Sequence, residues 1–179
     1  MLNKSFLTLL SLIVILAVVG ISGCTSSGSS NSELEEYVTG AYNDSGVSFT
    51  VPDGWKAYKE SGNKVAQAVG DNVRLYIYRY DGSYETAKDT ADTQAEHFRY
   101  WNNEPIVTSV SINGDKGYSV FGYDGHEERY EDHYIVKKGN YIFDLDFSTV
   151  TDTDSVSGGI AVDRLSSSEV YQILGSFSA

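Results

Sequence analysis

The sequence contains very little cysteine, very little proline and few basic residues. Among its 179 residues are one cysteine, Cys24, and two prolines. A single cysteine excludes an internal disulfide and a metal site built from several thiolates. Lysine and arginine number 13 against 25 acidic residues, which gives a formal net charge of −12. Binding to nucleic acid or to anionic lipid headgroups needs a basic surface, so we expect no nucleic-acid partner.

The sequence also lacks the short motifs of common enzyme families. It has no Gly-x-Ser-x-Gly elbow, no His-Glu-x-x-His and no glycine loop for phosphates. Of the three histidines, His97 falls within a predicted helix, where we expect a surface or boundary position. We therefore predict no catalytic residues, no cofactor and no enzymatic activity.

One long apolar run is present, at the amino terminus. Lys4 precedes an apolar stretch over residues 6–21, which is short for a membrane span and long enough for a signal peptide. It leads into Ile21-Ser22-Gly23-Cys24, which resembles the lipobox of prokaryotic lipoproteins. We expect cleavage after residue 23 and a lipid on Cys24, with the protein on the extracytoplasmic face of the cell membrane. An uncleaved anchor helix is the alternative.

The remainder divides into a tether and one domain. Residues 24–36 carry the cysteine and a run of serine and glycine that cannot form a core, which is typical of a flexible tether. Residues 37–179 show strand and helix patterns throughout. Alternating or apolar segments bounded by turn residues predict strands over 37–42, 47–51, 65–69, 73–80, 106–112, 117–123, 127–137 and 141–148.

Two segments have helical periodicity instead. Residues 83–101 place apolar side chains three and four positions apart, with Ser83 as the expected N-cap. A closing helix is expected to begin at Ser166, where Glu169 completes a capping box. Residues 149–159 read as irregular. Hairpins combined with two helices predict an α+β domain, an antiparallel sheet flanked by helices.

Two short segments resemble the PsbP-like and Mog1-like group of domains. Gly46 to Trp55 is similar to the opening strand of these domains, with its proline and tryptophan, and Ile173-Leu174-x-Ser176-Phe177 is similar to their last helix. The resemblance covers residues 37–179. The layout looks most like stand-alone lipoproteins of methanogenic archaea. It implies an α/β/α sandwich and a non-catalytic binding or accessory role.

A histidine lies among carboxylates in the last predicted hairpin. If Gly139-Asn140 forms a two-residue turn, His133 lies opposite Asp146 and Glu131 lies opposite Ser148 on one face. A divalent metal bound by His133, Asp146 and Glu131 is one interpretation. The favoured interpretation is a solvated face whose charges keep the sheet soluble, with no metal.

Two further features concern the surface. Tyr76, Tyr78 and Tyr80 share one face of a strand, and tyrosines offer a large contact area to a partner. The alternative is that helices cover both faces of this strand. Asn43-Asp44-Ser45 is a glycosylation sequon, which would place a sugar on Asn43 in an exported chain.

Two functions remain open after these observations. The first is a membrane-anchored, non-catalytic binding module with a membrane or envelope protein as its partner. The second is a secreted, metal-dependent hydrolase or metal-binding protein. A pocket holding several converging carboxylates or histidines would favour the second.

Overall fold

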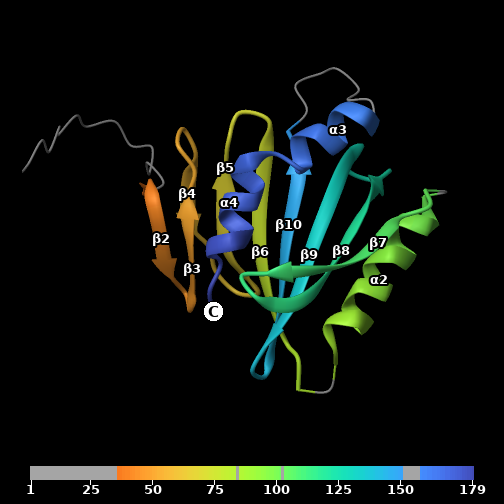
Figure 1. The fold of residues 1–179 in the computed structure, drawn as a ribbon, viewed down its shortest axis with the longest axis horizontal. Helices are drawn as coiled ribbons and strands as arrows, with labels where there is room; N and C mark the ends of the chain where they lie inside the picture. The colour runs from red at the N-terminus through yellow and green to blue at the C-terminus, as the bar shows by residue number, and fades with distance from the viewer. Residues whose placement is uncertain (1–35, 84, 102, 151–157) are drawn as a thin grey trace, which may run out of the picture. The chain divides into compact units, whose positions relative to one another are not determined.

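The described residues form an eight-stranded antiparallel sheet with helices packed on both of its faces (Figure 1). The computed structural model describes residues 36–83, 85–101, 103–150 and 158–179. The predicted signal peptide, Cys24 and nearly all of the tether therefore lie outside the described residues. No helix within the described ranges is long and apolar enough to cross a membrane.

The sheet joins strands from both halves of the domain. The spatial order is β1 (Tyr37–Val38), β4 (Lys56–Lys59), β5 (Lys64–Val69), β6 (Val73–Asp81), β10 (Tyr141–Thr149), β9 (Arg129–Lys138), β8 (Asp115–Asp124) and β7 (Ile106–Ile112). The last strand, β10, thus returns to the middle of the sheet and pairs with β6. A separate hairpin consists of β2 (Gly40–Asp44) and β3 (Val47–Val51).

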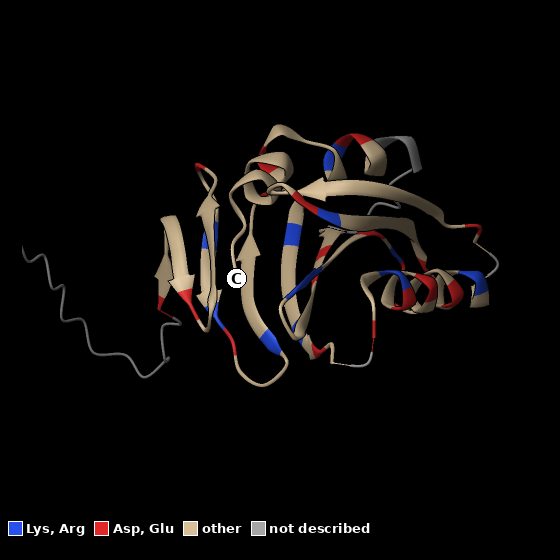
Figure 2. Cartoon of the chain, turned by 60° about the horizontal axis from the view of Figure 1, so that its bottom comes forward, with Lys and Arg blue, Asp and Glu red and all other residues tan. Residues whose placement is uncertain are grey.

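Helix α2 (Ala87–Tyr100) covers one face, which we call the α2 face. Its buried side chains are Ala87, Ala91, Ala95 and Phe98, spaced three and four residues apart as one helical stripe requires. They pack on residues of β8, β9 and β10, namely Val120, Ile135 and Ile142. Small alanines allow the helix to approach the sheet closely. Charges of both signs occupy the rest of α2 (Figure 2).

The opposite face holds the larger core. Helices α3 (Gly158–Leu165) and α4 (Ser168–Ser176) contribute Leu165, Val170, Ile173 and Leu174. These pack with Leu75 and Ile77 of β6, with Phe143, Leu145 and Phe147 of β10, and with apolar side chains of the β2–β3 hairpin. The expected α+β class, with an antiparallel sheet between helices, is confirmed.

The hairpin of β9 and β10 has the register expected from its turn. His133 pairs with Asp146, Tyr134 with Leu145, and Glu131 with Ser148. Gly139 has a φ of +58°, a left-handed value that favours glycine in a two-residue hairpin turn. Because side chains alternate along a strand, this register decides which residues share the α2 face.

Both predicted helix caps are wrong by a few residues. Helix α2 begins after Thr86 rather than Ser83, because the Thr86 hydroxyl accepts from the Asp89 N–H and the Asp89 carboxylate accepts from the Thr86 N–H. Ser83 instead donates to Asp81. Helix α4 is capped by Ser167, whose hydroxyl accepts from the Val170 N–H, and not by Ser166.

Other boundaries also differ from the prediction. The expected strand over 37–42 is split into β1 and β2, with Gly40 at a φ of +78°. Strand β4 was missed because Lys56-Ala57-Tyr58-Lys59 is short and polar, and α3 was missed because two glycines open it. Trp55 is 7% exposed, so it folds onto the core as expected.

Candidate functional site

Four ionisable residues lie together beneath the α2 face of β9 and β10, and we call them the acid–histidine cluster. Glu131 and His133 come from β9, Asp144 and Asp146 from β10. Their exposed fractions are 5% or less. Strand alternation and the hairpin register bring them together, because residues two apart on one strand face the same side.

His133 is held between two carboxylates. Its Nδ1 lies 3.0 Å from Asp144 Oδ1, and its Nε2 lies 3.2 Å from Glu131 Oε2. Burial opposes a positive charge on the ring, but the carboxylates of Asp144 and Asp146 more than offset it. The pKa of His133 is therefore raised well above its usual value.

The two acidic neighbours of His133 differ in their surroundings. Glu131 receives a hydrogen bond from Arg129 Nε at 2.7 Å. Burial alone would raise the pKa of Glu131, but His133 and Arg129 together lower it. Burial raises the pKa of Asp146 to about 7. Within the described part of the chain, Asp146 Oδ1 is buried without a hydrogen-bond partner.

The structure brings together all three residues of the predicted metal set. Each of Glu131, His133 and Asp146 offers one ligand atom, and these atoms lie within 4.8 Å of one another. The favoured interpretation of this face as solvated is wrong. Gln94 of α2 donates to Asp144 at 3.3 Å, and the Phe98 ring lies 5.7 Å from the His133 ring, so α2 covers the cluster.

Sequence reasoning did not assign Asp144 and Arg129 to the site. The predicted register already placed Asp144 on the same face, opposite Ile135, so the signal for it was present. Arg129 lies two residues before Glu131 on β9 and therefore faces the same side. His97 is 45% exposed at its side chain and bonds Asp124 at 3.1 Å, in agreement with the expected surface position.

The tyrosine row of Tyr76, Tyr78 and Tyr80 lies on the same face, beside the cluster. Tyr76 pairs with Asp146 and Tyr78 with Asp144 across β6 and β10. Adjacent rings of the row are 6.2 Å apart, and all three residues are partly exposed. Burial raises the pKa of Tyr80 to about 12, with a further contribution from Asp144. The row is thus neither fully covered nor fully free.

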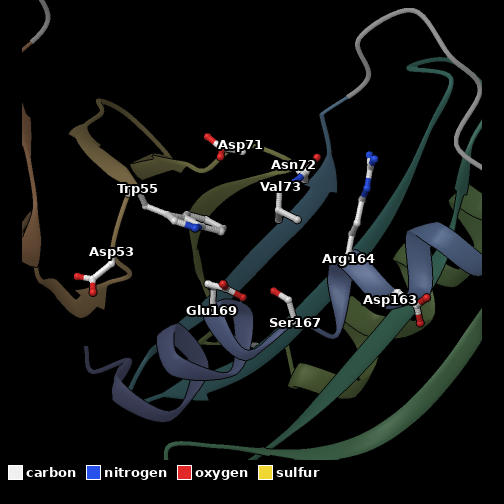
Figure 3. A pocket seen from close by; sticks show the side chains of 10 residues that line it. Asp53, Trp55, Asp71, Asn72, Val73, Asp163, Arg164, Ser167 and Glu169 are labelled. Carbon is white, nitrogen blue, oxygen red and sulfur yellow. The ribbon is translucent and has the colours of Figure 1, made fainter.

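A cavity that the sequence did not reveal lies on the other side of the molecule, and we call it the Trp55 cavity. Its volume is about 390 Å³. Trp55, Val73, Ser167 and Glu169 lie around it, and Arg164 stands at its side (Figure 3). The complete lining is Asp53, Gly54, Trp55, Asp71, Asn72, Val73, Asp163, Arg164, Ser167 and Glu169. These residues come from two turns of the sheet and from α3 and α4, so sequence neighbours could not indicate them.

A second cavity, of about 650 Å³, lies beside the β2–β3 hairpin and β4. Asn43, the residue of the glycosylation sequon, lines it and is exposed on β2. Tyr58 and Lys59 lie on its other side. A sugar on Asn43 remains a prediction.

No protein-family model matches the sequence, and no protein of curated function matches it. Two solved structures are similar to this fold. Cyanobacterial PsbP (CyanoP) from Synechocystis is 14% identical, with a TM-score of 0.49, over 89% of this chain and 98% of its own. A Bacteroides thetaiotaomicron protein is 12% identical, with a TM-score of 0.48, over 79% of this chain. The match spans about half, 48%, of the Bacteroides protein. CyanoP belongs to the PsbP group that the sequence resembles.

Proposed function

We propose that this protein is a lipoprotein whose domain is a non-catalytic binding module on the extracytoplasmic face of a cell membrane. The lipid is attached to Cys24. The partner is a membrane or envelope protein. The observation that carries the binding role is the Trp55 cavity, because its volume of about 390 Å³ falls in the range of ligand sites.

The lining of the cavity indicates the chemistry of the partner. The Trp55 indole and Val73 supply an apolar surface, and Asp53, Asp71 and Glu169 supply carboxylates around it. An aromatic ring beside carboxylates suits a cationic group carried on an apolar stem. A lysine or arginine side chain of the partner has this form.

The hydrogen bonds of the histidines support a non-catalytic role. A histidine that activates a hydroxyl nucleophile lies within hydrogen-bond reach of it. In the described part of the chain, the side-chain partners of His97 and His133 are carboxylates, and His126 lies 3.8 Å from the Glu127 carboxylate. The acid–histidine cluster lines neither of the two cavities described above. A hydrolase would need its reacting groups in such a cavity.

The anchor is tested by metabolic labelling. Cells expressing the full chain are fed an alkyne-bearing fatty acid, and the labelled protein is compared with a Cys24→Ser variant. We expect label on the parent alone, together with loss of residues 1–23 by mass spectrometry. An intact Met1 and an unmodified Cys24 thiol in the native protein would refute the lipid anchor.

The binding role is tested by photo-crosslinking in the native membrane. A photoreactive amino acid replaces Asp71, an exposed residue of the cavity lining, and in a control it replaces Tyr100, which is 77% exposed on α2. We expect one reproducible crosslinked membrane protein from position 71 and none from position 100. Glu169→Gln should reduce that product. Equal products from both positions would contradict a partner at the Trp55 cavity.

A further inference from the structure

The donor atoms of the acid–histidine cluster have the arrangement of a metal site with its supporting partner. Asp144 accepts from Nδ1 of His133, which fixes the ring and leaves Nε2 directed toward Glu131. Histidines that bind metals commonly donate their other ring N–H to a carboxylate in this way. Arg129 bonds Oε1 of Glu131, while Oε2 faces Nε2 of His133.

The balance of charge in the cluster points to a missing cation. Three buried carboxylates face one permanent cation, Arg129, and a histidine. With His133 protonated the group keeps one excess negative charge. A divalent cation on a neutral His133 makes the cluster neutral. Buried charge without compensation is costly, so the neutral arrangement is the more stable.

An unpartnered oxygen supplies an independent observation. Asp146 is 5% exposed, and its Oδ1 has no hydrogen-bond partner among the described residues. Buried carboxylate oxygens are normally paired, and an exception calls for an ion, a water or a functional explanation. Asp146 also supplies one of the three ligand atoms that lie within 4.8 Å of one another. The cluster therefore has an open acceptor directed toward the other two ligands.

We propose that Glu131, His133 and Asp146 bind one divalent metal ion of the zinc class, with Asp144 as the residue that orients His133. One imidazole nitrogen and two carboxylate oxygens form a ligand set that zinc accepts. The ion joins β9 to β10 beneath α2. This site is separate from the lipid on Cys24 and from the Trp55 cavity, so it stands or fails independently of the proposed function.

Zinc binding to the full-length chain tests the proposal. All proteins carry Cys24→Ser, which removes the single thiol of the chain as a competing ligand. Zinc is measured by equilibrium dialysis with elemental analysis. We expect about one tightly bound zinc per parent chain and a loss of affinity of at least ~10-fold in His133→Gln and Asp146→Asn.

Two matched controls separate the site from general effects. Asp132→Asn changes a buried carboxylate of the same strand that faces the other side of the sheet, where it accepts from Ser119. His97→Gln removes an exposed histidine that bonds Asp124. Both controls should bind zinc as the parent does. Loss of zinc in His97→Gln would place the ion at the surface and overturn the proposal.

Spectroscopy keeps the proposal decidable if a variant fails to fold. Zinc added to the folded parent should shift the Nε2 resonance of His133 and raise the melting temperature, because ligands that bind the native state stabilise it. The resonances of His97 and His126 should stay in place. A parent that binds no zinc, or an unshifted His133 in the zinc-bound parent, would show that the cluster is only a buried ion network.

Discussion

At the scale of single residues, the register of one hairpin decided most of what the sequence could predict about the cluster. A two-residue turn at Gly139 fixed the partners of His133 and Asp146, and the structure has the same pairing. The burial of these residues was not predictable in this way. It arises from Phe98 and Gln94, which reach the cluster from a helix more than 30 residues earlier in the chain.

Asp124 is a residue whose charge should contribute to stability in a pH-dependent way. Burial opposes ionisation, but hydrogen bonds from His97 and from the N–H groups of His126 and Glu127 more than offset it and lower the pKa of Asp124. A carboxylate with a lowered pKa stabilises the fold above its unfolded-state pKa, and this contribution disappears as the pH falls through the folded-state value.

We therefore expect Asp124→Asn to reduce the free energy of unfolding by about 1 kcal/mol at pH 7, where the His97 interaction is lost. The difference from the parent should vanish near pH 2, well below the ordinary pKa of aspartate. Urea unfolding at several pH values measures it. Asp53→Asn, at an exposed turn, is the control. A difference that persists unchanged at low pH would argue against the charge as its cause.

At the scale of elements, strands with clear alternation were predicted well and helix ends were not. The predicted strands 47–51 and 106–112 have the same bounds as β3 and β7. Ser83 and Thr86 are both acceptable N-caps by residue type. What selects Thr86 is Asp89, three positions later, because its carboxylate returns a hydrogen bond to the cap. Ser166 and Ser167 present the same ambiguity at α4.

Thr86→Ala should destabilise the protein by about 1 kcal/mol, since it removes the hydroxyl that accepts from the Asp89 N–H. Ser83→Ala removes an exposed bond to Asp81 outside the helix and should have a smaller effect. Thermal and urea unfolding of the two variants compare them directly. A larger loss in Ser83→Ala would mean that the helix begins earlier than Thr86.

At the scale of the whole molecule, the sequence predicted the fold class but not the order of the strands. Hairpin turns identify neighbours along the chain, such as β8, β9 and β10, whereas the pairing of β6 with β10 joins distant segments. The Trp55 cavity depends on the same long-range assembly, because β-turns and helices from both halves form its walls. No local pattern carries that information.

The tyrosine row gives a prediction at this scale that rests on the proposed binding role. Because the row is partly exposed beside α2, we expect Tyr78→Ala to weaken binding of the crosslinked partner by about tenfold or more, as loss of a central interface tyrosine does. Tyr171→Ala, at a residue that is 56% exposed on α4, is the control. Equal binding by both variants would remove the row from the partner surface.

The seam between β6 and β10 has a consequence for how fast the chain acquires its structure. Helix α2 and strands β7, β8 and β9 all lie between the two partners along the chain, so a long loop must close before the seam forms. We expect truncations of Leu75 or Leu145 to slow refolding, and truncations within the β2–β3 hairpin mainly to speed unfolding. Stopped-flow kinetics of such variants would show which half of an exported polypeptide waits for the other.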